Sequence, residues 1–390
     1  MKKIFLILFT CINITGNAQW IQQSSGSTSN LLGIYFSDTL NGYICGSTGT
    51  ILKTVDGGNN WISCSYSTPY DLRSVYFIDA DTGYVVGNNG LILKTTNGGT
   101  NWNQQASNST NALLSVYFIN ADTGYVATGT VILKTTNRGN TWINDSTGTT
   151  SFFYTVTFAD NLTGYVAGSG GRLLKTTTGG SHWTQLPSGT SQALYSINFV
   201  DANIGYSVGT NGTIIKTIDS GVDWTSLTSG TTQDLYSVFF IDANNGFAVG
   251  GDIIQTIILK TTDGGINWVS QPSPINEPLN SVFFVNYFNG YAVGLSGSII
   301  KTTNGLGINE SKMANGVSVY PNPATTVFTV STEGEKIIEL SVTNALGEGV
   351  FKETFAENTA IIDVSSLAKG MYFLQVKTEK GVSNKKLIKE

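Results

Sequence analysis

Short apolar runs alternate with turns rich in Gly, Asn and Asp along most of the chain, and the same order of runs and turns returns about every 41 residues. In the clearest copy the apolar or alternating segments lie at 72–78, 84–86, 91–95 and 102–105. Segments this short, bounded by turn residues, are typical of β-strands. Each repeat therefore predicts four short strands.

A tryptophan marks each repeat, and a phenylalanine follows each tryptophan after sixteen residues. The tryptophans are Trp20, Trp61, Trp102, Trp142, Trp183, Trp224 and Trp268. Four strands in about 41 residues are typical of a propeller blade, and radial stacking of blades buries both faces of each sheet. We predict an all-β chain whose residues 19–309 form a seven-bladed β-propeller.

The two ends of this propeller are predicted to share one blade. Seven Lys-Thr elements occur along the chain; a tryptophan follows the first six after eight residues, but Asn309 follows the seventh, at Lys301. Trp20 has no hairpin before it. We expect the strand from Trp20 to Gln23 to be the outer strand of the seventh blade, which would remove the open edge of the sheet.

The lysines of these elements account for seven of the ten basic residues of the propeller. They are Lys53, Lys94, Lys134, Lys175, Lys216, Lys260 and Lys301. An Asp or Asn stands two residues after each marker phenylalanine, on the same predicted rim. We expect each lysine to reach that turn of its own blade or the carbonyls of that turn; seven solvated lysines are the alternative.

The hairpin before each later tryptophan carries a second repeated motif. Segments 54–61, 217–224 and 261–268 follow Ser/Thr-x-Asp-x-Gly-x-x-Trp, and Asn or Thr replaces the Asp in the other complete copies. The motif resembles the Asp-box of sialidase-type repeats. Because Asp, Asn and Thr oxygens accept backbone N–H groups in turns and Gly tolerates positive φ, we interpret the motif as a structural hairpin covered by the tryptophan.

The whole unit, Leu-x-Ser-Val-Tyr-Phe-x-Asp-x-x-x-Gly-Tyr-x-x-Gly-x-x-Gly-x-Ile-Leu-Lys-Thr, resembles the repeat of the photosystem II stability and assembly factor family over residues 19–309. The resemblance implies a seven-bladed binding propeller. It also implies an arginine patch for a partner protein in photosynthetic members. This propeller has only Arg73, Arg138 and Arg172, which puts a photosynthetic partner in doubt.

Composition changes after Asn309, where Lys and Glu replace Ser, Thr and Asn. We expect a linker at 310–316 and a small β-sandwich at 317–390. The segments "VYPNPA", "NALGE", "LAKGMYFLQV" and "KKLIKE" resemble the C-terminal sorting domain of type IX secretion. This resemblance implies the type IX secretion machinery as a partner and export across the outer membrane, with the protein released or attached at the cell surface.

Residues 1–18 are typical of a signal peptide, because two lysines precede an apolar run that ends before small residues. The run is too short to span a membrane, so we predict no transmembrane segment in the mature chain. Cleavage would leave Cys45 and Cys64. We place them on the second and fourth strands of one sheet, too far apart for a disulfide.

Charge and residue counts exclude several function classes. Charged residues make up 12% of the chain and the net charge is −5, which gives no electrostatic footprint for nucleic acid. His182 is the only histidine, so we predict no His-based triad, no metal site and no cofactor. We assign no catalytic residue and favour a non-enzymatic protein. The neighbouring acids Asp234 and Glu277 leave a carbohydrate-active hydrolase or lyase as the alternative.

One rim of the propeller is the predicted ligand-binding surface, because the connections between blades and the turns between second and third strands share it and vary in length. At the start of the innermost strand three successive blades carry tyrosine. The predicted ligand-binding residues are Tyr154, Tyr195, Tyr236, Arg73, Phe152, Asp234 and Glu277. The rings could instead fill gaps between blades. We predict a secreted or cell-surface, monomeric binding or scaffolding propeller for a protein or glycan ligand.

Overall fold

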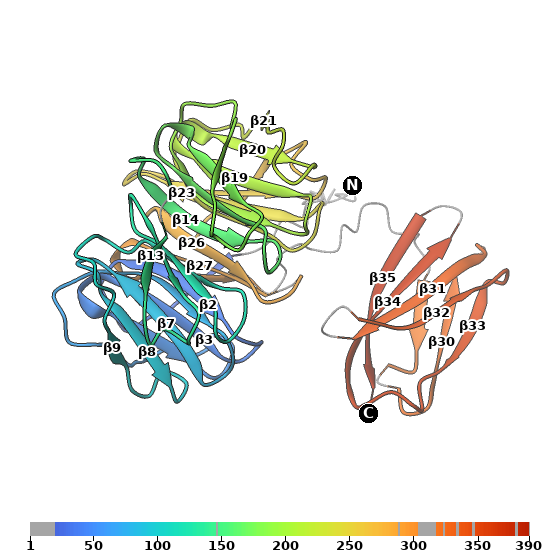
Figure 1. Cartoon of the computed structure of the whole chain (residues 1–390). Helices are drawn as coiled ribbons and strands as arrows, with labels where there is room; N and C mark the ends of the chain where they lie inside the picture. Colours follow the sequence, from blue (N-terminus) through green and yellow to red (C-terminus); the bar gives the residue numbers. More distant parts are fainter. Residues whose placement is uncertain are drawn as a thin grey trace, which may run out of the picture. The chain divides into compact units, whose positions relative to one another are not determined.

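The computed structural model describes residues 20–302 except 146 and 288, and residues 317–389 except 323, 333–334, 345–347 and 379–380. The chain divides into one compact unit that ends at Leu306 and another that begins at Gly307 (Figure 1). The predicted leader 1–18 and linker 310–316 lie outside the described residues. No helix in the described part of the chain is long and apolar enough to cross a membrane.

The first unit is a seven-bladed β-propeller, as predicted, and each blade is a four-stranded antiparallel sheet. Blade 1 contains β2 (Leu31–Phe36), β3 (Gly42–Gly46), β4 (Ile51–Thr54) and β5 (Ile62–Ser63). Blade 2 contains β6 (Leu72–Phe77), β7 (Thr82–Gly87), β8 (Ile92–Thr96) and β9 (Asn103–Gln105). Blade 3 contains β10 (Ser115–Phe118), β11 (Gly124–Ala127), β12 (Ile132–Thr135) and β13 (Ile143–Asp145).

The later blades repeat this plan. Blade 4 contains β14 (Phe153–Phe158), β15 (Gly164–Gly168), β16 (Leu173–Thr176) and β17 (Thr184–Leu186). Blade 5 contains β18 (Leu194–Phe199), β19 (Gly205–Gly209), β20 (Ile214–Thr217) and β21 (Thr225–Leu227). Blade 6 contains β22 (Leu235–Phe240), β23 (Gly246–Gly251), β24 (Thr256–Thr261) and β25 (Val269–Ser270). Short 3-10 turns join the second and third strands of four blades: η1 (Ser47–Gly49), η2 (Ser169–Gly171), η3 (Thr210–Gly212) and η4 (Leu295–Gly297).

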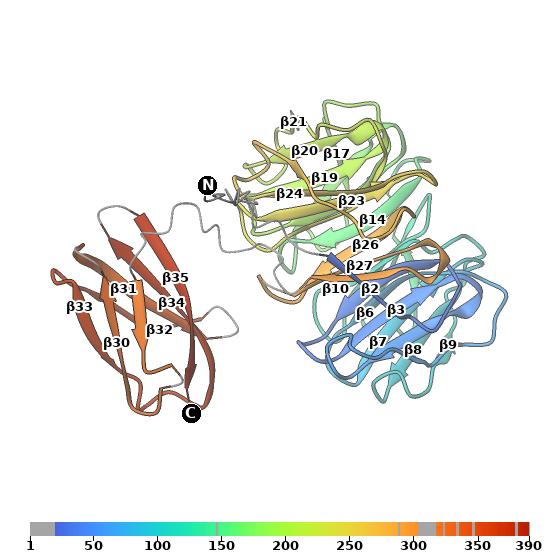
Figure 2. The ribbon, with the colours of Figure 1, turned by 180° about the vertical axis from the view of Figure 1, so that it is seen from behind.

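Blade 7 combines the two ends of the propeller, which confirms the predicted closure. Its strands are β26 (Leu279–Phe284), β27 (Gly290–Gly294), β28 (Ile299–Thr302) and β1 (Trp20–Gln23). Strand β1 pairs antiparallel with β28, with Trp20 opposite Thr302, and Figure 2 shows the blue start of the chain beside the orange strands of blade 7. The Trp20 ring is 4% exposed and meets the rings of Phe247 and Phe284 edge-on.

The core between blades is built from the residues that mark the repeat. In blade 2 the marker Phe77 stacks on Tyr43 of blade 1, with 3.6 Å between ring centres, and meets the edge of Trp102 at 6.0 Å. A Cβ atom at Gly83 would lie 2.5 Å from the Phe77 ring, so only glycine fits there. The spacing from phenylalanine to glycine in the repeat therefore reflects direct packing.

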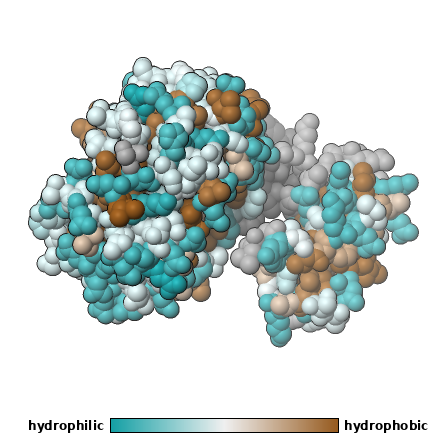
Figure 3. Space-filling model, viewed as in Figure 1, coloured by the Kyte–Doolittle hydropathy of each residue, from teal (hydrophilic) through white to brown (hydrophobic). Residues whose placement is uncertain are grey.

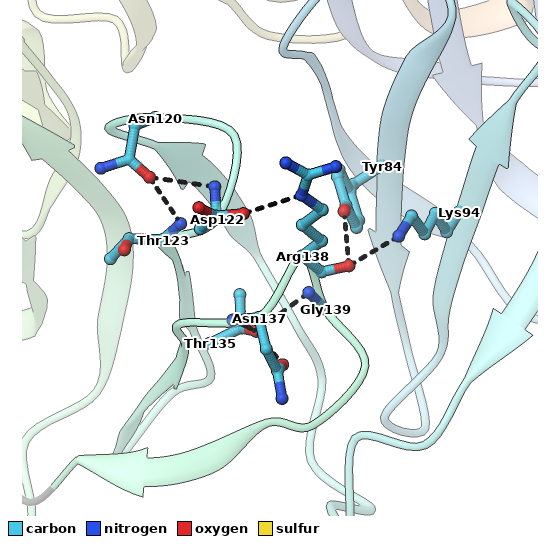
Figure 4. Close-up of polar contacts among 9 residues, drawn as sticks. All are labelled: Tyr84, Lys94, Asn120, Asp122, Thr123, Thr135, Asn137, Arg138 and Gly139. Carbon is cyan, nitrogen blue, oxygen red and sulfur yellow. Dashed lines mark hydrogen bonds and ion pairs between the residues drawn. The ribbon is translucent and has the colours of Figure 1, made fainter.

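Each lysine of the Lys-Thr elements was expected to reach the turn after the first strand of its own blade, and this prediction was wrong for six of the seven. Lys94 Nζ instead donates to the carbonyl oxygen of Arg138 in the hairpin of blade 3, at 2.7 Å. Tyr84, which pairs with Lys94 across β7 and β8, donates its hydroxyl to the same oxygen at 2.7 Å (Figure 4). The lysine therefore joins two blades.

Six blades repeat this shared carbonyl, and the lysine to acceptor distances are 2.5–2.8 Å. The acceptors are the carbonyl oxygens of Gly57, Gly98, Arg138, Gly179, Ser220 and Gly264. In blade 6 the tyrosine position holds Phe247, and Lys260 Nζ lies 6.0 Å from the centre of that ring. The turn that the lysines were expected to bind is closed by its own Asp or Asn, as in Asp38, which accepts the N–H groups of Leu40 and Asn41.

The hairpin motif has the structural role that the sequence predicts. Thr54 Oγ1 accepts the Gly58 N–H at 2.9 Å and donates to Asp56 Oδ1 at 2.8 Å, and Asp56 also accepts the Asn60 N–H at 2.9 Å. Gly58 has φ of 75°. These bonds fix the turn whose carbonyl at Gly57 receives the lysine and tyrosine of blade 7.

The second unit is the predicted small β-sandwich. One sheet contains β29 (Val317–Tyr320), β30 (Val327–Thr332) and β33 (Thr359–Asp363). The other contains β32 (Gly349–Thr354), β31 (Ile337–Asn344), β34 (Gly370–Thr378) and β35 (Gly381–Lys389). Residues from both sheets, including Phe328 and Leu374, form its core. In the propeller, Cys45 is buried, Cys64 is half-buried and both are free thiols, as predicted.

Closure through Trp20 can be tested by truncating its ring. Trp20→Ala should lower the free energy of unfolding by about 3–5 kcal/mol, because it removes a buried tryptophan. The control is Ile21→Ala, whose side chain is 50% exposed. Thermal unfolding followed by tryptophan fluorescence would measure both, and equal melting temperatures for Trp20→Ala and the wild type would contradict the closure.

The shared carbonyl can be tested in blade 4, where Lys175 and Tyr165 both donate to Ser220 O at 2.7 Å. Lys175→Met and Tyr165→Phe should each cost about 0.5–1 kcal/mol, because the other donor still satisfies the oxygen. The double variant leaves that oxygen without its two donors, so it should cost more than the sum. Urea denaturation of the four proteins would measure this, and strictly additive costs would argue against a shared acceptor.

The hairpin carboxylate predicts a pH dependence. Donation by the Asn60 side chain and N–H and by Thr54 lowers the pKa of Asp56 to about 2. Because the unfolded value is near 3.9, this carboxylate stabilises the fold above about pH 4, and the contribution is lost as pH falls toward 2. Asp56→Asn keeps the accepting oxygen but does not titrate. Its melting temperature should therefore fall less between pH 6 and pH 2.5 than that of the wild type; an equal fall would exclude Asp56 as a contributor.

Candidate ligand-binding rim

The three rim tyrosines occupy β-bulges at the start of the innermost strands. The pairing register shifts between Phe153 and Thr155, and the blades of Tyr195 and Tyr236 show the same shift. A bulge leaves one residue outside the ladder and redirects its side chain. The backbone of the repeat therefore sets the position of these tyrosines, and sequence patterns alone did not reveal the bulge.

The tyrosines form a continuous arc over blades 4 to 6, which we call the tyrosine arc (Tyr154, Tyr195 and Tyr236). The ring centres of Tyr154 and Tyr195 are 5.0 Å apart, and those of Tyr195 and Tyr236 are 5.5 Å apart. Phe152 extends the arc, 5.2 Å from Tyr154, and is 41% exposed. The three tyrosines are half-buried, so each ring keeps an accessible part.

The hydroxyl groups of the arc are available to a ligand. Within the described residues they have no hydrogen-bond partner from the protein. Burial, and then the charge of Asp234 and the neighbouring tyrosines, raise the pKa of Tyr195 to about 12. Burial and the charges of Asp234 and Asp252 likewise raise the pKa of Tyr236. Both hydroxyls are therefore protonated donors at neutral pH.

The acidic residues near this rim have structural partners. Asp234 Oδ1 accepts the N–H of Asn211, in the turn of blade 5, at 2.9 Å. Asp71 stands at the same place in blade 2 and forms an ion pair with Arg73 at 3.2 Å. Glu277 lies in the connection to blade 7, where its backbone carbonyl accepts from Thr256 at 2.7 Å.

The structure therefore brings together only part of the predicted site. Tyr154, Tyr195, Tyr236 and Phe152 contact one another, and the charge of Asp234 acts on two of the tyrosines. Arg73 instead bonds Asp71 and Asn88 within blade 2. Across the described residues no hydrogen bond, ion pair or ring contact joins Arg73 or Glu277 to the arc.

A second group of aromatic residues lies deeper in the innermost strands, and the sequence interpretation missed it. The neighbouring rings are Phe239, Phe283, Tyr35, Tyr76 and Tyr117, with centres 5.0–5.3 Å apart. Each stands directly before a marker phenylalanine, which is the signal that could have found them. Tyr76 and Tyr117 donate to carbonyls of the next blade at 3.0 and 3.1 Å, so these two hydroxyls are occupied and join blades.

No group of three or more His, Cys, Asp or Glu residues in the described ranges could hold a metal ion. The hydrolase alternative rested on Asp234 and Glu277, and each of these carboxylates has its own partner. Asp234 accepts the Asn211 N–H, and Glu277 accepts the Asn276 N–H at 3.3 Å. The chemistry on this rim therefore consists of aromatic faces, phenolic donors and a few carboxylates. That set suits recognition by stacking and hydrogen bonding.

Comparison with protein-family models gives two matches. The model for photosynthesis system II assembly factor YCF48 matches residues 12–110, 63–146 and 176–270, which together cover more than half of the chain. The model for the secretion system C-terminal sorting domain matches residues 318–390. The sorting domain indicates export through type IX secretion to the outer membrane or the extracellular space. No curated protein matches the sequence.

Solved structures share the propeller fold at low sequence identity. YCF48 from Cyanidioschyzon merolae is 22% identical with a TM-score of 0.63, over 73% of this chain and 99% of that one. A structure described as YCF48 bound to D1 peptide is 19% identical with a TM-score of 0.63, over 73% and 96%. The WD40 β-propeller domain of Doa1 is 11% identical with a TM-score of 0.61, over 72% and 96%.

Proposed function

The chain belongs to the photosynthesis system II assembly factor YCF48 family, and from this premise we propose that it is an exported, non-enzymatic propeller that binds a partner at the rim carrying the tyrosine arc. The protein would act outside the cell or attached to its surface, where the sorting domain directs it. The propeller would supply the binding surface, and the sorting domain would direct export.

The observation that carries this proposal is the contrast between the two aromatic groups. Tyr76 and Tyr117 donate their hydroxyls to the neighbouring blade, whereas Tyr154, Tyr195 and Tyr236 have no protein partner within the described residues. A half-buried tyrosine with an unoccupied hydroxyl offers both an apolar face and a directional donor. Three of them in contact favour a ligand that lies across several blades.

We place a polypeptide first among the ligand classes, because a solved neighbour with this fold holds a peptide. The flat tyrosine faces also suit the apolar faces of sugar rings, so a glycan is the second candidate. The hydrolase alternative loses support because Asp234 holds the neighbouring turn, and Glu277 has a partner of its own.

Binding at the arc can be tested with the mature full chain. Tyr154→Ala/Tyr195→Ala/Tyr236→Ala should weaken binding at least tenfold on peptide and glycan arrays, because it removes stacking and donors together. The matching triple Phe variant keeps the rings and should lose binding that depends on the hydroxyls. Tyr70→Ala/Tyr287→Ala is the control, since these tyrosines are 39% and 41% exposed and lie outside the arc. Full binding by a triple Ala variant with wild-type melting temperature would rule out the arc as the binding site.

A further inference from the structure

Blade 6 has a hairpin that departs from the repeat on the ligand rim. Its strands β23 and β24 extend further than in other blades, and the tip contains Asp252, Ile253, Ile254 and Gln255. Ile253 is 85% exposed and Ile254 is 80% exposed, more than any other large apolar side chain in the described residues. On the face drawn in Figure 3, apolar residues lie singly or in small groups among polar ones. These two adjacent isoleucines therefore stand out by their exposure among the apolar side chains of the described residues.

Hydrogen bonds brace both the tip and the base of this hairpin. Asp252 Oδ1 accepts the N–H groups of Ile254 and Gln255 at 2.8 and 2.9 Å. At the base of the hairpin, Thr256 donates to the carbonyl oxygens of Ile275 and Glu277 in the connection to blade 7. An ordered tip loses little conformational freedom when it binds a partner, so it can use its apolar surface for affinity.

A groove with a volume of about 680 Å³ lies beside the hairpin. Gln255 lines it from blade 6, while blade 5 contributes neutral polar side chains such as Asn211, Ser226, Ser229 and Gln233. Ser226 belongs to β21, which is the outermost strand of blade 5 and has a strand on one side only. An exposed strand edge with neutral hydrogen-bonding groups suits an extended polypeptide, which can add to it through backbone bonds.

The charges around the groove are negative. Asp252 lies in the tip, Asp234 lies at the foot of the hairpin where its carbonyl accepts the Gly251 N–H, and Glu277 lies in the connection tied to Thr256. Six lysines of the propeller donate to hairpin turns on the opposite rim, so they do not offset these acids. An anionic membrane surface would be repelled here, whereas a basic segment would be attracted.

We infer that the Ile253-Ile254 tip and the adjoining groove form a docking surface for an extended, basic polypeptide segment of a partner protein that also carries aliphatic side chains. The aliphatic side chains of the segment pack on the two isoleucines, its backbone lies along β21, and its basic groups face the three acids. This inference rests on the proposed function, because it names the chemistry of a partner for the same rim.

The probe is a set of synthetic twelve-residue peptides of four compositions: aliphatic and basic, aliphatic and acidic, aliphatic and neutral, and basic without aliphatic residues. Binding to the mature full chain is measured by biolayer interferometry. Aliphatic and basic peptides should bind at least tenfold more tightly than aliphatic and acidic ones. Equal binding of these two classes, or stronger binding of the acidic class, would overturn the inference.

Three variants locate the surface. Ile253→Ser/Ile254→Ser should weaken binding of the aliphatic and basic peptides at least tenfold. Asp252→Asn/Glu277→Gln should weaken it about threefold and reduce its salt dependence, while Asn still accepts the N–H groups of the tip. Ile218→Ser/Ile266→Ser is the matched control, because these isoleucines are 69% and 72% exposed in hairpin turns of the opposite rim. Equal losses in the control would overturn the assignment.

A lipid surface or a second copy of the chain at the tip would each give a different experimental result. Binding to vesicles of phosphatidylcholine and phosphatidylglycerol that is lost in the Ile253→Ser/Ile254→Ser protein would mean that the tip serves a lipid surface instead. Self-association in sedimentation experiments, lost in the same variant, would mean that the tip binds a second copy of the chain.

If the triple Ala variant of the arc loses binding while the tip variants keep it, the proposed function stands and this inference fails. If the tip variants alone lose binding, the arc proposal fails.

Discussion

The propeller depends on one carbonyl group in each of the six described hairpins, which receives a lysine ammonium and a tyrosine hydroxyl from the preceding blade. The residue that bears this carbonyl has positive φ in all six described cases, including the non-glycine Arg138 and Ser220. Its own N–H bonds the first turn of its blade, as Arg138 N bonds Asp122 O. One residue thus joins the hairpin, the first turn and the neighbouring blade. A lysine donating to a carbonyl without a counter-ion is tolerated because it remains half-exposed, where water still solvates its charge.

The same interaction explains why the two rims differ. The six shared carbonyls lie on the rim that carries the hairpins before the tryptophans, and together with the pairing of β1 and β28 they close the ring. The turns on this rim must therefore keep one geometry. On the opposite rim a different contact between blades occurs at three junctions, where Asp71, Asp234 or Asn30 accepts an N–H group from the turn of the preceding blade. The turns of that rim still vary in length, from the short turn at Gly129 to the long hairpin of blade 6. Residues on that rim can therefore change without loss of closure.

The sequence predicted those features that depend on spacing. The intervals between Trp, Phe and Gly fixed the blades because these residues pack directly on one another, and the unpaired Trp20 predicted the shared blade. The sequence did not predict which carbonyl each lysine binds. The acceptor lies in the next blade, and the spacing of residues within one repeat does not show which of its side chains face that blade. Nor did it predict the bulges at Tyr154, Tyr195 and Tyr236, since a register shift leaves no mark in the apolar pattern. Whether a tyrosine hydroxyl is occupied depends on where the carbonyl groups of the neighbouring blade lie, and the residue pattern does not encode that position.

The distribution of charge follows from the same architecture. A chain with only 12% charged residues has few cations, and the propeller uses its lysines between blades. Arg73 and Arg138 are likewise paired with Asp71 and Asp122. Asp234, Asp252 and Glu277 on the rim of the tyrosine arc form no ion pair within the described residues, although the net charge of the chain is only −5. The negative character of this rim follows from the use of the lysines for closure together with Asp252 in the extended hairpin of blade 6, and it electrostatically favours a basic partner.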